Sequence, residues 1–580
     1  MSTRLLPIEQ STDVVTYKIE IAGEALPTTI AIYSIEVIHE INRIPTATLI
    51  LSDGDTATGE WPVSSDSFFL SGNEIKIFAG YHSEDEEIFS GIVISQTIRV
   101  RNNRLELIIQ CKDKTISMTS VKKSRHFSDV TDADAAAEIM DEYSITNDIA
   151  ATNITHVDLV QYDTTDWDFI IMRLESNGLS SFVDGTGFHA VKPTADGEPV
   201  ATLQFGSNVI EFDADVDARR QLGAVTSQSW DFTGQELVVG EAADPAWKIA
   251  GNQEPEALAK AVGASTIILR HSADLSSDEL QSWSDAVLLR SRMAAIRGRA
   301  RIQGLSALTP TSIVELAGFG DRFNGPVWLS AVRHEISLGN WLCDVEFGMP
   351  ETWHAERHQV NAHSANVLMP MVSGLHTGIV TTLEDPLEEG RIRVKIPAVD
   401  LEGDGVWARV ATLDAGNSRG TFFLPEIDDE VILGFLNDDP RYPVVLGMLH
   451  SSNHAPPEKA ADANNIKGYY SRKGMRLLFD DDKGILTVDT PGGHQMILDD
   501  DGGKVTLKDS NGNKLEMSSS GITIESAGDI AMKASKNIKI EGQTNLEIKA
   551  GAQWKAEGSA GMEISSSGIT VVKGSLVQIN

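Results

Sequence analysis

The sequence predicts a mainly β protein with a few helices, a small closed barrel and a C-terminal β-helix. Three observations support this prediction. Short segments of alternating apolar and polar residues recur from residue 17 to 111 and again from 312 to 347. A compact series of similar segments lies between residues 373 and 449. From residue 476 onward, one apolar pattern repeats at a short and nearly fixed step.

The repeat consists of pairs of apolar residues with one residue between them, which recur every eight residues. A period of two indicates a strand, and the polar, glycine-rich stretches between pairs supply turns. The regular pairs, which we predict to form a core, are Ile522/Ile524, Ile530/Met532, Ile538/Ile540, Leu546/Ile548, Trp554/Ala556 and Met562/Ile564. Steps of seven to ten residues continue the pattern backward to Leu477/Phe479, and a one-residue slip precedes its continuation to Val577/Ile579.

Two inward side chains for each strand are too few to form a core within one chain, because eight residues supply one face of a coil and not a closed cross-section. Three chains that wind around one axis would each supply one face, and their strand edges would pair with one another. We therefore predict an intertwined homotrimeric β-helix over residues 476–580. The alternatives are a single-chain β-helix and a series of hairpins.

Length and composition exclude several classes of protein. A chain of 580 residues is expected to contain three or four domains. Its formal net charge of −36 opposes binding to nucleic acid or to an anionic membrane surface, since like charges repel. Cys111 and Cys343 lie far apart in predicted strands and are interpreted as buried thiols. The first residues contain no apolar segment typical of a signal peptide, so we expect synthesis in the cytosol.

The first two thirds of the chain are predicted to form strands with three helices among them. The predicted strands cover residues 17–21, 30–37, 47–51, 74–78, 88–94, 104–111, 312–316, 327–332 and 341–347. The first helix begins after the candidate N-cap Thr131 and extends to Met140. The second follows a capping Thr or Asp within 163–166, and the third begins at a capping box formed by Ser276 and Glu279. The apolar faces are expected to include Ile171, Leu174 and Gly178 in the second helix and Ala286, Leu289, Met293 and Ile296 in the third.

A compact all-β unit is predicted from residue 373 to 449. Its expected strands cover residues 379–380, 391–396, 407–410, 421–424, 430–435 and 444–448. Their number and length favour a small closed barrel of the oligonucleotide/oligosaccharide-binding (OB) type. Nucleic-acid binding by such a barrel needs exposed aromatic residues and a basic groove. We expect Trp407, Phe422, Phe423 and Phe435 to lie in the core instead.

A series of motifs in this unit resembles the OB domain of VgrG, the spike protein of type VI secretion, and of contractile-phage spikes. The motifs are 390–394 (GRIRV), 407–410 (WARV), 415–420 (AGNSRG), 424–431 (LPEIDDEV), 434–440 (GFLNDDP) and 443–447 (PVVLG). Upstream, residues 163–169 (DTTDWDF), Asn177–Gly178, 322–325 (RFNG) and His334 are similar to the tail-hub domain of that family. The octads differ from the family because they lack the regular Val-x-Gly of phage needles.

The resemblance implies four regions: a tail hub over residues 1–365, an OB domain over 372–450, a linker over 451–475 and a trimeric β-helix needle over 476–580. It also implies a homotrimeric central spike that joins a hexameric inner tube and baseplate proteins to a needle that breaches a target membrane. A small PAAR-type tip protein would dock on Leu576, Val577 and Ile579. Such a protein is made in the bacterial cytoplasm without a signal peptide and acts within an injection particle or a phage tail.

No catalytic, cofactor or metal site is expected. Residues 416–420 match G-x-S-x-G but lack the strand–helix context of a nucleophile elbow, and 185–190 are expected to form a hairpin turn. His354, His358 and His363 are expected in a solvated linker, not in a metal site. The aspartates of 480–484 and 499–503 are interpreted as turn residues, not as calcium ligands. The alternative functions are a phage spike that degrades an envelope and a trimeric receptor-binding fibre.

Overall fold

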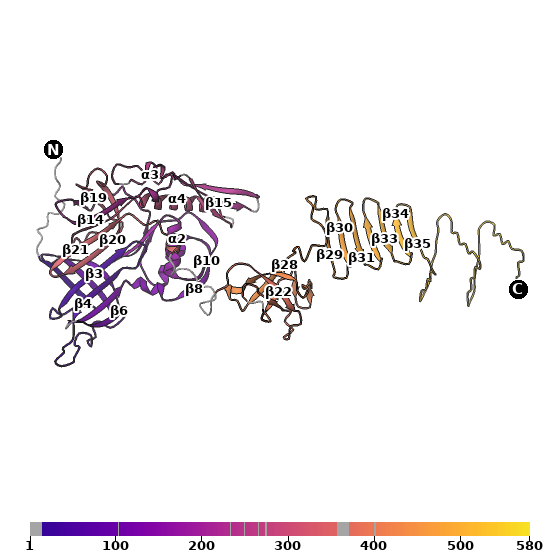
Figure 1. The fold of residues 1–580 in the computed structure, drawn as a ribbon, viewed down its shortest axis with the longest axis horizontal. Coiled ribbons are helices and arrows are strands. Elements are labelled where there is room, and N and C mark those ends of the chain that lie inside the picture. The colour runs from indigo at the N-terminus through magenta and orange to yellow at the C-terminus, as the bar shows by residue number, and fades with distance from the viewer. Residues whose placement is uncertain are drawn as a thin grey trace. The chain divides into compact units, whose positions relative to one another are not determined.

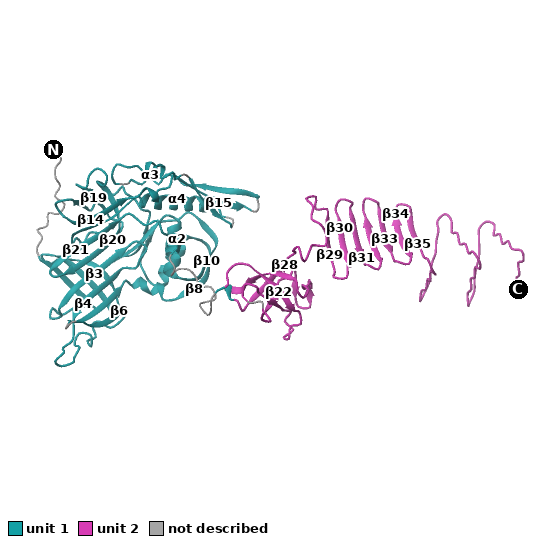
Figure 2. Cartoon of the chain, viewed as in Figure 1, with its two compact units in different colours: residues 1–371, 437–439 teal, residues 372–436, 440–580 magenta. Residues whose placement is uncertain are grey.

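The computed structural model describes residues 14–579, except 102–103, 232–233, 249, 265, 273–274, 357–370 and 400–401. The chain separates into two compact units, residues 1–371 with 437–439 and residues 372–436 with 440–580 (Figure 2). Strands account for most of the regular structure in both units (Figure 1), which confirms the predicted mainly β fold.

One large sheet forms the body of the first unit. Its strands follow the order β14-β18-β21-β20-β3-β4-β7-β6-β5-β1-β2, and β19 joins β13 to β20. Their bounds are β1 Val15–Ile21, β2 Glu24–Ala25, β3 Ile32–Glu40, β4 Thr46–Ser52, β5 Glu74–Tyr81, β6 Glu84–Arg101, β7 Arg104–Lys112, β13 Ala201–Gln204, β14 Val209–Val216, β18 Ile296–Gln303, β19 Ile313–Ala317, β20 Gly325–Ser337 and β21 Asn340–Phe347. Because β3 pairs with β20, residues from both ends of this unit share one sheet.

Alternate residues of this sheet form the largest apolar core of the unit. Phe69, Phe89, Leu49 and Ile75 are among its fully buried side chains. Both cysteines belong to the same core and are free thiols, which confirms their interpretation as buried thiols. Burial raises the pKa of Cys111 to about 12 and that of Cys343 to about 12, so both remain protonated at neutral pH.

The three predicted helices are present and begin at the predicted caps. Helix α1 (Asp132–Glu142) begins after Thr131, which forms a capping box with Asp134. Thr165 caps α2 (Asp166–Ser176) by accepting a hydrogen bond from the backbone N–H of Asp168. Helix α4 (Ser277–Met293) begins at the predicted Ser276–Glu279 box. A short helix, α3 (Pro255–Ala261), was not predicted.

Two residues that we assigned to helix faces lie beyond the helices. Gly178 follows the end of α2 with a positive φ of 72°, a conformation that glycine adopts without strain. Ile296 is the first residue of β18, because α4 ends at Met293. Both predictions were wrong because the apolar periodicity continues past the point at which the backbone leaves the helix.

Three smaller sheets complete the first unit. Strand β8 (Lys122–Thr131) pairs with β10 (Thr155–Thr165), and β12 (Gly187–Val191) lies between β11 (Ser180–Asp184) and β9 (Asn147–Ile149). Residues 185–186 connect β11 to β12, which confirms the predicted hairpin turn. In the third sheet, β15 (Ala224–Asp231) lies between β16 (Glu236–Glu241) and β17 (Thr266–His271). Short 3₁₀ helices cover Lys114–Thr119, Ala218–Arg220 and His354–Glu356.

His354 lies in a buried polar network and not in a solvated linker, so that prediction was wrong. Its Nε2 is 2.8 Å from Asp168 Oδ1, and its backbone N–H donates to Glu175 Oε2 at 2.8 Å. The other carboxylate oxygen of Glu175 accepts from Asn42 and from Arg290, at 2.8 and 2.7 Å. His358 and His363 lie outside the described residues. Among the residues described, no group of three or more His, Cys, Asp or Glu has a metal-binding arrangement.

We expect Arg290→Met to destabilise the first unit strongly. Arg290 is 8% exposed, and its guanidinium also donates to the backbone oxygens of Pro350 and Thr352. Its loss leaves the Glu175 carboxylate buried without its cation, which costs about 3–5 kcal/mol. Calorimetry of the full chain should show a lower melting temperature for this unit. The double variant with Glu175→Gln should recover part of the loss, and an unchanged or larger loss would contradict this reason.

The second unit begins with a closed barrel of five strands, as predicted. The strands are β22 His376–Thr382, β23 Ile392–Lys395, β24 Val406–Val410, β27 Glu430–Phe435 and β28 Pro443–Met448. Val380, Ile392, Val394, Val431 and Leu433 form the centre of its core. A parallel pair closes the barrel, because Arg409 lies opposite Val444 in β24 and β28.

The predicted strand at 421–424 is absent from the barrel. Strands β25 (Ala415–Gly416) and β26 (Arg419–Gly420) form a short hairpin before it, so the G-x-S-x-G motif does not lie on a strand–helix turn. Phe422 is 83% exposed and Phe423 is 62% exposed, in contrast to the predicted core positions. Trp407 is half-buried beneath the guanidinium groups of Arg391 and Arg393, and Phe435 packs at the edge of the core. The β24–β28 pair closes the barrel without residues 421–424, which explains the difference.

A seven-stranded antiparallel sheet follows the barrel, and each strand pairs with the next (Figure 1). Within one chain, Ile466–Glu525 thus form a series of hairpins, the arrangement that we gave as an alternative to an intertwined β-helix. The strands are β29 Ile466–Tyr470, β30 Arg476–Asp480, β31 Ile485–Asp489, β32 Gln495–Asp499, β33 Lys504–Lys508, β34 Lys514–Ser518 and β35 Gly521–Glu525. The sheet thus begins at Ile466, within the segment that we predicted as a linker. At its turns, Asp480 accepts from the N–H of Lys483 and Asp499 from that of Gly502, as expected for turn aspartates.

Candidate interaction surface

The register of the seven-stranded sheet places the repeated apolar pairs on one face. Leu477 lies opposite Val488, and Phe479 opposite Leu486, and the same relation holds between each later pair of strands. One row of facing residues is Leu477, Val488, Met496, Leu507, Leu515 and Ile524, and the other is Phe479, Leu486, Leu498, Val505, Met517 and Ile522. Residues directly opposite in an antiparallel sheet point to the same side. We call these two rows the apolar face.

Much of the apolar face is open to solvent in the single chain. Leu507 is 57% exposed, and Ile522 and Ile524 are 70% and 62% exposed. A hollow that runs along this face is lined by Val488, Met496, Leu507, Leu515 and Ile524, and continues to Ile530. A contiguous apolar surface of this kind marks an interaction site in a soluble protein.

The opposite face of the same sheet has a different chemistry. Its central row consists of Leu478, Thr487, Ile497, Thr506, Glu516 and Thr523. At one end of this row, Arg476 Nη2 lies 2.6 Å from Asp489 Oδ2, and the hydrogen bond from Arg476 lowers the pKa of Asp489. Threonines and paired charges suit a solvated surface. The asymmetry between the faces therefore identifies the apolar face as the one that needs a partner.

The remaining predicted core residues do not meet one another in the single chain. Between Ser526 and Ile579, the described residues form no strand, and the chain passes back and forth without pairing with itself (Figure 1). Exposure reaches at least 50% at Ile530, Met532, Ile538, Ile540, Leu546, Ile548, Met562 and Ile564. The predicted tip-binding residues Leu576, Val577 and Ile579 are also exposed. Their roles in the needle core and in binding a tip protein therefore stay predictions.

One residue of this surface, Tyr469, was not predicted from the sequence pattern. It lies on β29 opposite Leu477 and therefore extends the first row of the apolar face by one strand. The alternation of Ile466, Gly468 and Tyr470 with Lys467 and Tyr469 is weak, because Lys467 occupies the position that an apolar residue holds on later strands. The two adjacent tyrosines at 469–470 were the sequence feature that could have indicated a strand here.

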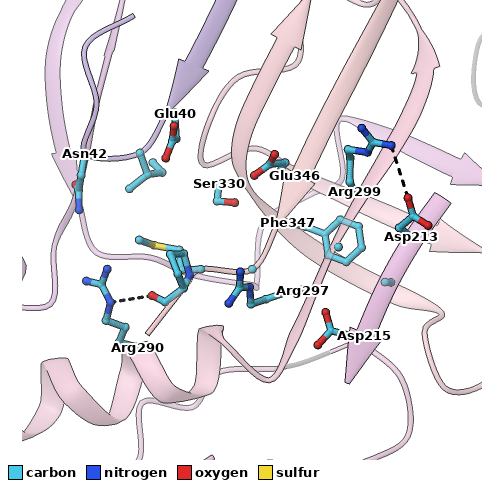
Figure 3. Close-up of a pocket in the computed structure, with 16 residues that line it drawn as sticks. Glu40, Asn42, Asp213, Asp215, Arg290, Arg297, Arg299, Ser330, Glu346 and Phe347 are labelled. Carbon is cyan, nitrogen blue, oxygen red and sulfur yellow. Dashed lines mark hydrogen bonds and ion pairs between the residues drawn. The ribbon is translucent and has the colours of Figure 1, made fainter. Parts of the chain in front are cut away.

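A pocket in the first unit carries many charges, and Figure 3 shows its lining. Arg299 lies 3.6 Å from Asp213 and 3.2 Å from Glu211, and Arg297 lies 3.4 Å from Glu351. These cations pair with neighbouring carboxylates. Such exposed pairs contribute about 1 kcal/mol or less each, and they offset the positive charge that would attract an anionic ligand.

Among the residues that the structure describes, no helix is long and apolar enough to cross a membrane.

Three family models match the chain and together cover most of it. The model of the Alg8 N-terminal domain matches residues 11–337, more than half of the chain. The type VI secretion system/phage-baseplate injector OB domain matches residues 376–450, where the closed barrel lies. The phage baseplate V C-terminal trimerisation domain matches residues 485–547, which include β31–β35. The chain belongs to the VgrG and contractile-tail spike family, with an Alg8 N-terminal domain.

Curated relatives in this family match over short stretches. The type VI secretion system spike protein VgrG4b of Pseudomonas aeruginosa is 32% identical over 139 residues, which are 22% of this chain and 16% of the relative. The spike protein VgrG3 of Vibrio cholerae is 31% identical over 104 residues, which are 16% of this chain and 10% of the relative. The chain thus spans less than a fifth of the length of these relatives.

Solved structures of a prophage tail protein and of a VgrG complex are similar to the chain over larger parts. The 43 kDa tail protein of prophage MuSo2 from Shewanella oneidensis covers 58% of this chain and 99% of its own, with a TM-score of 0.45 and 10% identity. The lidless PdpA–VgrG complex covers 90% of this chain and 100% of its own, with a TM-score of 0.37 and 10% identity.

We expect Leu507→Asp to destabilise the assembled protein far more than Lys508→Asp. Leu507 belongs to the apolar face, whereas Lys508 points to the opposite side of β33. A carboxylate buried between chains costs several kcal/mol, whereas a change at an exposed position costs about 0.5 kcal/mol or less. Thermal unfolding at several protein concentrations should show this difference. Equal melting temperatures for the two variants would contradict a covered apolar face.

Proposed function

We propose that the chain is the homotrimeric central spike and hub of a contractile injection system. The observation that carries this proposal is the exposed apolar face of β30–β35, which coincides with the match to a trimerisation domain. Burial of one large apolar side chain contributes about 1.5–3 kcal/mol. Three copies that cover one another's apolar faces bury two rows of such residues each, which favours a very stable assembly.

The role we propose is mechanical, with no covalent chemistry. A rod of strands from three chains has no free internal hinge, because each level is hydrogen-bonded to its neighbours and packed on a shared core. Such a rod transmits force along its axis. We propose that it carries the thrust of a contracting sheath to a target membrane.

The proposed regions follow the family resemblance. We propose a tail hub over residues 1–365 that contacts the hexameric inner tube and baseplate proteins, an OB domain over 372–450 and a needle over 476–580 to which β29 adds a first strand. The match to the baseplate injector OB domain supports a place in the baseplate. The proposed location is an injection particle or a phage tail.

The proposed needle core continues beyond the sheet. It comprises Ile522, Ile524, Ile530, Met532, Ile538, Ile540, Leu546, Ile548, Met562 and Ile564. After Glu525 the chain leaves its own neighbouring passes unpaired (Figure 1). Backbone groups that have no partner within the chain can pair with strands of two other copies, which supports an intertwined needle.

We expect the full-length chain to have three times its monomer mass in solution, since one chain cannot cover its own apolar face. Multi-angle light scattering at micromolar concentration measures this directly. Ile538→Asp should shift the protein toward monomers, because it places three carboxylates within one apolar layer. Lys539→Asp is the matched control and should remain trimeric. A monomeric wild-type chain would rule out the proposal.

We also propose that a PAAR-type tip protein binds Leu576, Val577 and Ile579, which are exposed apolar side chains. A trimer truncated before Gly574 should capture less of such a protein in a pull-down than the full-length trimer. Ile579→Asp should reduce capture more than Gln578→Asp. A carboxylate placed in an apolar contact weakens binding because it must give up its hydration, whereas residue 578 is already polar. Undiminished capture by the truncated trimer would place the tip-binding surface elsewhere.

A further inference from the structure

The loop that follows the β25–β26 hairpin carries exposed apolar side chains. Phe422 is 83% exposed, and Leu413, just before the hairpin, is 88% exposed. Both lie outside the closed barrel, whose strands pair without this segment. A large aromatic side chain this exposed is costly in water and is enriched at protein interfaces.

Contacts on both sides fix this loop in place. Leu424 packs against the barrel core. On the other side, the ring of Phe423 stacks on that of Tyr469 with centroids 5.3 Å apart and an interplanar angle of 15°. Arg472 Nη1 also lies 2.7 Å from Glu426 Oε2. Phe422 therefore lies between two anchored residues, Phe423 and Thr421, whose backbone N–H donates to the Asp414 oxygen at 2.9 Å.

The loop is continuous with the apolar face of the sheet. Tyr469 lies opposite Leu477, the first member of one row, and Phe423 stacks on Tyr469. The row that begins at Ile524 thus passes through Leu477 and Tyr469 and reaches the loop next to the barrel. Whatever covers the row along its length also approaches Phe423 and Phe422.

We propose that Phe422, with Leu413, extends the interface between copies of this chain from the sheet to the barrel. The proposal rests on the proposed homotrimer, because the same partner that covers the apolar face meets the loop at its end. The loop of each copy packs against the sheet or barrel of the next, so the three barrels are held in register with the needle.

The charges around the loop agree with a protein partner. Asp414, Glu426, Asp428 and Asp429 lie near the aromatic residues in the sequence. Two of them pair with arginines, Asp414 with Arg419 at 2.8 Å and Glu426 with Arg472 at 2.7 Å, so the four carboxylates still outnumber these two cations. Single-stranded nucleic acid needs a basic groove beside its stacking aromatics. The acidic surroundings therefore disfavour nucleic acid, although the barrel is of the OB type.

Single-cysteine labelling tests the proposal in the full chain. Both native cysteines are buried and free, so an introduced surface cysteine is the reactive thiol. We choose Phe422→Cys, with Asn417→Cys at the exposed hairpin turn as matched control and Leu507→Cys as a reporter of the needle interface. The measurement is the rate of maleimide labelling under native conditions. Labelling at residue 422 should be at least about tenfold slower than at 417, a difference that corresponds to about 1.4 kcal/mol of protection.

The outcomes separate this inference from the proposed function. Slow labelling at both 507 and 422 supports the inference, provided that labelling of Phe422→Cys becomes fast when Ile538→Asp dissociates the chains. Slow labelling at 507 with fast labelling at 422 overturns it and leaves the homotrimer intact. Fast labelling at both positions overturns both. Slow labelling at 422 that persists in the Ile538→Asp background also overturns it, because the protection would then come from within one chain.

Discussion

A β-sheet with one apolar face must have that face covered, and this constraint decides what the second unit is. Strict alternation along each strand sends every repeated apolar pair to the same side of β30–β35. A slip of one residue in any strand would turn its pair toward the polar side. The register is thus strongly specified, and it produces a surface that one chain leaves open. The need for a partner that covers this face follows from the sheet itself.

The other parts of the chain show the opposite behaviour, since each encloses its own core. The large sheet of the first unit buries Phe69 and Phe89, and the barrel buries Val380 and Val431. Many polar groups buried in the first unit also find partners within it, as the bonds from Arg290 and Asn42 to Glu175 show. Two domains bury their own apolar cores, whereas the sheet leaves one apolar face open. This contrast indicates that the C-terminal part of the chain functions in assembly.

Local patterns in the sequence sufficed to predict most strands, the helix caps and the apolar pairs. Alternation and capping depend on neighbours within a few residues, so they can be recognised in one chain. Apart from the two helix ends at Gly178 and Ile296, the errors involve contacts between distant residues. The parallel pairing of β24 with β28 excludes residues 421–424 from the barrel, and His354 is buried by Asp168 and Glu175, far away in the sequence. Tyr469 was not predicted because apolar and polar residues alternate only weakly in β29. The strand is recognised from its pairing with β30.

The turns of the sheet indicate how such an apolar face avoids the wrong partners. Aspartates at 480–482 and 499–501 occupy two turns at the same ends of the strands, and the chain as a whole carries a net charge of −36. Like charges repel when assembled needles approach side by side, and charge at exposed positions opposes aggregation through strand edges. In the proposed trimer, apolar side chains face the common axis and carboxylates face outward, so association around that axis is favoured over other contacts. The acidic composition that disfavours nucleic acid thereby also favours a discrete assembly over an open-ended one.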